Sequence, residues 1–149
     1  MTSINLLNLA KIGQLDPAPL SVDLVKRMLA AAKQRLRDAE FIQNSDETRF
    51  DCAYTAIRTV ADIGLLLNGF RTSTSQPGHH QTAVQCLAHT LGVDAATVRI
   101  LDGLRKQRNL AAYDGELVTD AALRECLNQA RAILIRVENV MQEHPKPGS

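Results

Sequence analysis

The segment LRKQRNLAAYDG, residues 104–115, carries two arginines, an asparagine and a tyrosine that could bind an anion. If the segment is helical, with about 100° between successive residues, Arg105, Asn109 and Tyr113 lie within about 80° of one another. Arg108 lies about 60° to the other side of Arg105. Arginine presents a planar fork to phosphate oxygens, and Asn and Tyr add hydrogen bonds. This stripe of four side chains predicts a binding site for phosphate or RNA backbone.

The same four residues also allow a structural interpretation. The core side of this helix is predicted to hold three residues: Ile100, Leu104 and Ala111. Arg108 borders that side and stays protonated, so it needs a carboxylate, a group of carbonyls or a bound anion. Three acids on earlier helices are candidate partners: Glu40, Asp51 and Asp62. In this interpretation Arg108 pairs with such an acid, Asn109 bonds a loop backbone and Tyr113 packs near the helix end.

Other chemistry finds less support in the sequence. His79 and His80 are adjacent, and neighbouring helical residues point about 100° apart, so the two imidazoles do not readily share a metal. They are expected at a helix start, with one of them contacting the preceding loop. No glycine-rich phosphate loop and no nucleophile elbow is present. No metal site and no cofactor is therefore expected.

Composition indicates one globular domain. The chain has 149 residues, of which 45% are hydrophobic and 22% charged, while aromatics make up only 3%. A core of Leu, Ile, Val and Ala favours helix-on-helix packing. The net charge of +1 gives no general attraction to nucleic acid, so such binding would need a local patch. Three widely spaced cysteines, Cys52, Cys86 and Cys126, predict small core residues rather than a disulfide framework.

Punctuation residues predict where the helices begin and end. Residues 1–20 are expected to form an N-terminal arm, because the prolines of DPAP prevent a continuous helix. The predicted helices cover about 21–40, 46–68, 79–91, 95–115 and 120–143, with four expected N-caps: Ser21, Ser45, Asp94 and Thr119. No strand is expected, and residues 144–149 are expected to be a disordered tail. The prediction is an all-α antiparallel up-down bundle of about five helices over residues 21–143.

Apolar residues at helical spacing predict the core. The second predicted helix has this stripe: Phe50, Ala53, Tyr54, Ile57, Val60, Ala61, Gly64 and Leu67. The last predicted helix has another: Ala122, Leu123, Cys126, Ala130, Ile133, Leu134, Val137 and Met141. The start of the chain lacks the pattern of a signal peptide, and the apolar runs fall short of the ~20 residues that span a bilayer. A cytoplasmic protein without membrane association is expected.

Two pieces of the sequence, in this order, resemble the HEPN superfamily of small helical bundles. The first is AYTAIRTVADIGLLLNGFRTSTSQPGHHQTAVQCL, a long helix that ends at a glycine, a polar loop, and GHH at the start of the next helix. The second is RKQRNLAAYDG, which is similar to the family's RN-x-x-x-H motif. The resemblance covers roughly residues 21–140.

This resemblance implies a homodimer, and for the ribonuclease members of the family a metal-free cleavage of RNA by an Arg-x(4–6)-His motif. There the arginine binds the scissile phosphate, the polar residue after it assists, and the histidine moves protons. By position, Arg108 matches the arginine, Asn109 the polar residue and Tyr113 the histidine. An unperturbed phenol, with a pKa of about 10, is a poor proton shuttle near pH 7.

The resemblance therefore leads us to expect a non-catalytic, homodimeric HEPN-like module that binds RNA, a nucleotide or a protein partner through Arg105, Arg108, Asn109 and Tyr113. A link to a toxin–antitoxin or defence system, with a cognate antitoxin or a nucleotidyltransferase-type partner, is also implied. The alternative is a metal-independent ribonuclease that uses Arg108 with Tyr113, or with a remote histidine such as His79 or His80. A third hypothesis is a helical scaffold in which Arg108 is salt-bridged and inert.

Overall fold

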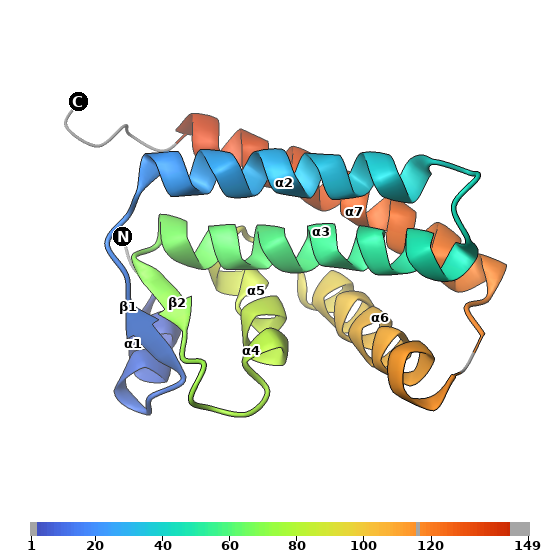
Figure 1. The fold of residues 1–149 in the computed structure, drawn as a ribbon. Helices are drawn as coiled ribbons and strands as arrows, with labels where there is room; N and C mark the ends of the chain where they lie inside the picture. The colour runs from blue at the N-terminus through green and yellow to red at the C-terminus, as the bar shows by residue number, and fades with distance from the viewer. Residues whose placement is uncertain (1–2, 116, 144–149) are drawn as a thin grey trace.

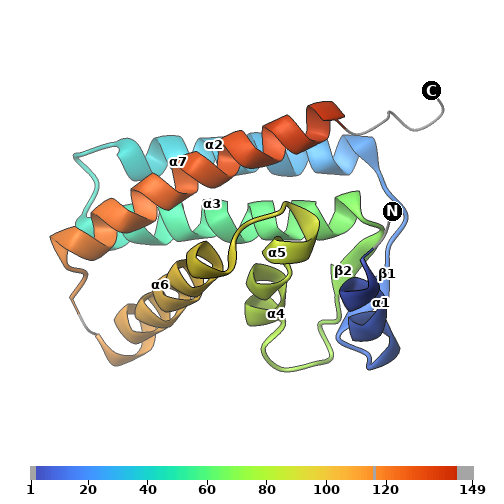
Figure 2. The same cartoon turned by 180° about the vertical axis from the view of Figure 1, so that it is seen from behind.

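Four long helices form the body of the protein. The computed structural model describes residues 3–115 and 117–143. Its long helices are α2 (Val22–Glu40), α3 (Asp46–Leu67), α6 (Ala95–Asp114) and α7 (Asp120–Glu143), and successive ones run in opposite directions (Figure 1). Helix α3 lies in the middle, with α2 and α7 on one side and α6 on the other (Figure 2). The predicted all-α antiparallel bundle is confirmed.

The prediction of a single helix over residues 79–91 is wrong in one respect. The helix is divided at Cys86 into α4 (His79–Gln85) and α5 (Leu87–Thr90). Both short helices lie on the same side of α3 as α6 (Figure 2). Helix α4 contacts both α3 and α6, so the three helices surround a common space.

The predicted N-caps all accept a hydrogen bond from the helix that follows. The side chains of Ser21, Ser45 and Asp94 accept from the backbone N–H three residues ahead, and Thr119 Oγ1 accepts from the N–H of Ala122 at 3.1 Å. Each cap satisfies a backbone donor that the helix cannot satisfy itself. Because each cap acts on the helix that follows it, the starts of the long helices could be predicted from the sequence.

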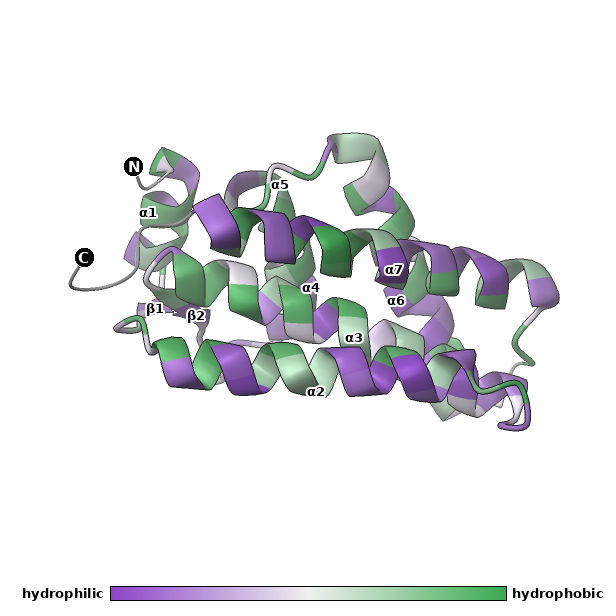
Figure 3. Ribbon diagram, turned by 90° about the horizontal axis from the view of Figure 1, so that it is seen from above, coloured by the Kyte–Doolittle hydropathy of each residue, from purple (hydrophilic) through white to green (hydrophobic). Residues whose placement is uncertain are grey.

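Helix α3 is the centre of the core because it is enclosed by other helices. Its predicted stripe is buried except for Leu67, and five further residues are buried as well: Cys52, Ala56, Ile63, Leu65 and Leu66. Along α2 and α7 hydrophobic and hydrophilic residues alternate (Figure 3), as is typical of helices with one apolar side. The predicted apolar side of α7 is buried from Ala122 to Val137, with Met141 packed against the core. Cys52, Cys86 and Cys126 are free and buried.

From Ser3 onwards the N-terminal arm folds back onto its own bundle. It forms α1 (Ile4–Lys11) and β1 (Leu15–Pro17), and β1 pairs antiparallel with β2 (Phe70–Thr72). The expectation that the chain has no strand is therefore wrong. Leu6 and Leu15 are completely buried, so the arm covers the end of the core at which α3 stops. Residues 144–149, predicted to be a disordered tail, lie outside the described residues.

Gly64 lets α3 and α5 approach closely, which generates a prediction for the fold. A Cβ atom at this position would meet Thr90 Oγ1 at 2.7 Å and Leu91 Cγ at 3.3 Å. We expect Gly64→Ala to lower the free energy of unfolding by about 1–3 kcal/mol, because a filled interface cannot accept a methyl group without moving. Urea denaturation followed by circular dichroism measures this change.

Gly103→Ala is the matched control, because Gly103 is also helical but a Cβ there meets nothing within 4 Å. Alanine is the better helix former, so this variant should gain roughly 0.5–1 kcal/mol. A similar gain at both positions would show that α3 and α5 are not closely packed at Gly64.

Candidate functional site

The side of α6 that faces the bundle carries arginines next to its core residues. Leu101 and Leu104 are the buried residues of α6. On the helical wheel Arg105 and Arg108 lie beside them, and the two arginine side chains are only 17% and 30% exposed. Ile100, predicted to face the core, is 39% exposed. Helix α6 is therefore rotated so that its inward side includes the two arginines, because it packs against α4 as well as α3.

A pocket of about 210 Å³ opens between α3, α4 and α6. It is lined by side chains from all three helices and by the glycine that precedes α4: Tyr54, Gly78, His79, His80, Gln81, Arg105, Arg108 and Asn109. Three of the four residues of the predicted stripe thus meet the two histidines in one place. We call this hollow the α3–α4–α6 pocket.

Tyr113 lies away from that pocket. It belongs to the last turn of α6, and it is 80% exposed. Since α6 separates from α4 towards its C-terminus (Figure 1), a side chain in its last turn has no facing helix on that side. Tyr113 is thus not joined to Arg105, Arg108 and Asn109 in the pocket.

Both arginines of the pocket are held by carboxylates. Arg108 Nε donates to Asp51 Oδ1 of α3 at 3.0 Å, and Arg105 Nε donates to Asp102 Oδ1 one turn back at 2.9 Å. Asp51 is one of the three acids that the sequence offered; Glu40 pairs with Arg131 instead, at 2.8 Å. Among the described residues, the side-chain hydrogen bonds of these two arginines use only Nε. Their terminal amino groups, each with two N–H donors, are left for another partner.

His80 is held neutral by its neighbours. Its Nδ1 lies 3.3 Å from Arg58 Nη1 of α3, and a guanidinium can only donate, so Nδ1 accepts and the imidazole proton sits on Nε2. Burial, together with the charge of Arg58, lowers the pKa of His80 to about 4. The ring of His79 packs edge-on against that of His80, with centroids 4.2 Å apart. One of these histidines was expected to contact the preceding loop; His80 instead contacts Arg58 of α3.

Asp62 lies one turn beyond Arg58 on α3, and it is the acid whose ionisation is most disfavoured. Burial raises the pKa of Asp62 to about 6, although Arg58 and His79 act in the opposite direction. The carboxyl is therefore ionised only in part at slightly acidic pH. Asp62, proposed from the sequence as a partner for Arg108, is placed beside Arg58 and His79 instead.

Two residues of α3 were not assigned to the site from the sequence: Tyr54, which lines the pocket, and Arg58, which contacts His80. Asp62, the next residue on the same side of α3, was assigned only as a partner for Arg108. The three residues are four positions apart, so they follow one line along the helix. Tyr54 was included in the apolar stripe, because a tyrosine at helical spacing among Ala, Ile and Val looks like a core residue. The detectable signal was the four-residue spacing of three polar residues within an otherwise apolar helix.

Comparison with known proteins identifies no relative: no protein family matches the chain, and no curated protein does. Within residues 3–115 and 117–143, no cluster of histidine, cysteine and acidic side chains could hold a metal ion. In the same part of the chain, no helix combines the length and apolarity needed to cross a membrane. What the fold and geometry define is an all-α bundle with a pocket that contains two arginines and two histidines.

The raised pKa of Asp62 predicts a pH-dependent cost in stability. The pKa is 3.8 for an ordinary Asp and about 6 in the folded protein. The folded state therefore binds more protons between these values, and the contribution of Asp62 makes the protein less stable as pH rises from about 4 to 6. We expect Asp62→Asn to be roughly 2–3 kcal/mol more stable than the wild type at pH 7.5.

That difference should shrink to nearly zero below pH 4, where both side chains are neutral. Urea denaturation of the two proteins across this pH range measures it. A constant difference at all pH values would show that Asp62 titrates normally in the folded protein.

Proposed function

We propose that this chain is a HEPN-like module that binds the phosphate backbone of RNA in the α3–α4–α6 pocket without cutting it. The observation that carries the proposal is that Arg105 and Arg108 turn inwards to the same pocket, with Asn109 beside them. Terminal guanidinium donors that converge on one hollow match the oxygens of a phosphate group.

The carboxylate beside Arg108 does not prevent an anion from binding. The partner of Arg108, Asp51, is more than half exposed, and ion pairs at such positions contribute little net energy. The Nε contacts instead fix the direction of each guanidinium, so that a phosphate meets donors that are already oriented. The small net charge of the chain agrees with a local site rather than a broad basic surface.

The basic residues of α2 are not part of this proposal. Lys33 pairs with Glu138 and Arg35 with Asp38, and α2 lies across α3 from α6 (Figure 1). We propose that the binding unit is a homodimer, as the resemblance to HEPN proteins implies. Two copies would give RNA two pockets to follow, which strengthens binding without a new kind of contact. A protein partner of the antitoxin or nucleotidyltransferase type belongs to the same proposal.

RNA binding should depend on the two arginines of the pocket. We expect Arg105→Ala and Arg108→Ala each to weaken binding of a fluorescein-labelled oligouridylate about tenfold. Each should also reduce the slope of log K against log salt by about 1, because one phosphate contact is lost. Fluorescence anisotropy over a salt series measures both values.

Lys106→Ala is the control, because Lys106 lies on the same helix, is 67% exposed and does not line the pocket. It removes the same charge and should change affinity less than twofold. Equal losses in all three variants would point to general attraction, and undiminished binding in both arginine variants would contradict the proposal.

The second candidate function is a metal-independent ribonuclease, which is favoured by one observation: His79 and His80 line the pocket beside the arginines. Cleavage through the 2′-hydroxyl needs a base to take its proton and an acid to protonate the leaving oxygen. His80 has no free lone pair for the base role, because its Nδ1 accepts from Arg58 and its Nε2 carries the proton. In this arrangement His79 would be the base, and His80 would donate a hydrogen bond from Nε2. This arrangement would use a remote histidine in place of Tyr113.

A cleavage assay in excess EDTA decides between the two functions. We expect the wild-type protein to leave a mixed-sequence RNA intact while it binds the oligouridylate. RNA cleavage that persists in EDTA and is lost in Arg108→Ala and in His80→Ala, each prepared identically, would replace the binding module with the ribonuclease. Cleavage that survives in both variants would indicate a contaminating enzyme.

A further inference from the structure

The hydroxyl of Tyr54 is an unused hydrogen-bond donor inside the protein. Tyr54 is only 3% exposed, and its Oη makes no hydrogen bond with any described residue. A buried polar group without a partner is unfavourable, and such groups are rare in folded proteins. The hydroxyl therefore needs a partner that comes from outside the chain.

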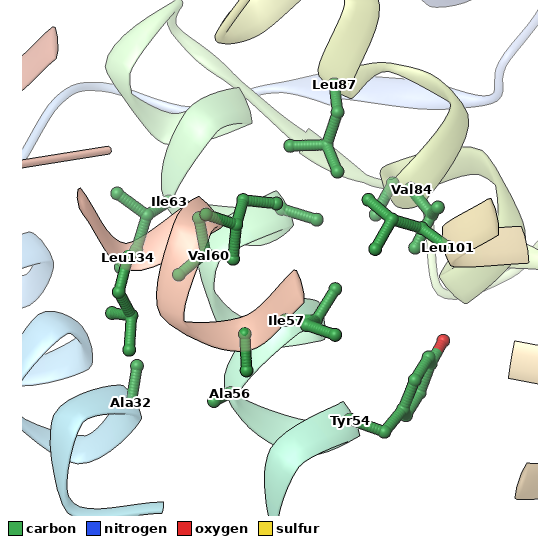
Figure 4. Close-up of a cluster of buried hydrophobic side chains, with 14 of the residues drawn as sticks. Ala32, Tyr54, Ala56, Ile57, Val60, Ile63, Val84, Leu87, Leu101 and Leu134 are labelled. Atoms are coloured by element: carbon green, nitrogen blue, oxygen red, sulfur yellow. The ribbon is translucent and has the colours of Figure 1, made fainter. Parts of the chain in front are cut away.

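The position of this hydroxyl indicates where that partner lies. Tyr54 lines the α3–α4–α6 pocket together with Arg105 and Arg108. Figure 4 shows its ring leaving α3 beyond Ile57, with the oxygen at the far end on the side where Leu101 of α6 lies. The side chain packs in the core at 3% exposure, and the residue lines one wall of the pocket. Tyrosine commonly combines an apolar body with a polar end in this way.

The electrical environment of the hydroxyl selects an anion. Burial raises the pKa of Tyr54 to about 12, so the phenol keeps its proton and remains a donor at neutral pH. Arg105, Arg58 and Arg108 act against this rise and Asp102 adds to it, so three guanidinium groups and one carboxylate lie near the oxygen. A ligand that accepts from a neutral O–H among several guanidinium groups is an oxyanion.

We propose that Tyr54 Oη donates a hydrogen bond to a phosphate oxygen of the bound ligand, and that this bond fixes one phosphate group between α3 and α6. The inference rests on the proposed binding function and adds a contact from α3. A pocket of about 210 Å³ has room for several water-sized groups, so one phosphate can lie within reach of both helices. The phosphate gives the buried hydroxyl a hydrogen-bond acceptor, and this bond favours the protein with phosphate bound over the empty protein.

Tyr54→Phe tests this contact, because it removes one oxygen and keeps the ring in the core. Binding of the fluorescein-labelled oligouridylate should weaken about tenfold or more, the usual effect of one lost hydrogen bond to a charged group. Inorganic phosphate should raise the melting temperature of the variant less than that of the wild type. Without ligand, the urea midpoint of the variant should equal or exceed that of the wild type.

Tyr113→Phe is the matched control, since it removes the same hydroxyl from an exposed ring outside the pocket. It should bind both probes as the wild type does. A loss of RNA binding in Tyr54→Phe without a loss for inorganic phosphate would overturn the inference, because the contact would then be to sugar or base. A clear fall of the urea midpoint without ligand would also overturn it, because the hydroxyl would then have a partner within the protein.

The failure of this inference differs from the failure of the proposed function. If Tyr54→Phe binds both probes normally while Arg108→Ala loses them, the pocket binds phosphate without Tyr54 and only the inference is wrong. If the wild type and Arg108→Ala bind neither probe, or bind them equally, the proposed function is wrong and the inference is overturned with it.

Discussion

The enclosure of α3 is the constraint on which the rest of the structure depends. Helices pack on both sides of it, and its residues from Phe50 to Leu66 are mostly buried. A helix in this position has few places for a polar side chain, since each buried polar group needs a partner. Its polar residues Tyr54, Arg58 and Asp62 lie along the line that faces α4 and α6. The pocket opens where Tyr54, the first of these residues, meets Arg105 and Arg108 of α6 and the two histidines of α4.

The arginines of α6 are oriented by the same arrangement. Because Leu101 and Leu104 anchor α6 against the core, Arg105 and Arg108 beside them lie at the border of the buried surface. Asp51 at the start of α3 holds Arg108, and Asp102 holds Arg105. Each guanidinium is thus attached through Nε to one carboxylate, and its terminal donors stay free of those contacts. Helix α6 thus packs against the core and still carries two arginines whose terminal N–H donors are not used by these carboxylates.

The helices could be predicted from the sequence because their ends are determined by local chemistry. Ser21, Ser45, Asp94 and Thr119 are caps that act on the following residues of the same helix. The pairing of β1 with β2 joins distant segments of the chain, and so it left no local signal. The break at Cys86 has no explanation in the structure. The three-residue strands are also too short for alternation to be visible in the sequence.

The candidate site could be predicted only in part, for a related reason. The wheel of α6 gave the mutual arrangement of Arg105, Arg108 and Asn109, but it could not tell which neighbouring helix they face. The exposure of Ile100 and of Tyr113 follows from how α6 is rotated and how it diverges from α4. In the sequence Tyr54 looked like an ordinary core residue. Helical periodicity predicts that a tyrosine is buried, but not whether its hydroxyl has a hydrogen-bond partner.

The pocket also keeps its charges in an unusual balance. Burial disfavours the charged form of any group, so it raises the pKa of Asp62 to about 6 and lowers that of His80 to about 4. The contribution of Asp62 lowers the free energy of unfolding as pH rises from about 4 to 6. The contribution of His80 raises it as pH rises from about 4 to 6.5. Between about pH 4 and 6 the two contributions have opposite signs, so they offset one another in part. Near neutral pH His80 is uncharged, so the arginines rather than His80 would supply the positive charge that the proposed phosphate site requires.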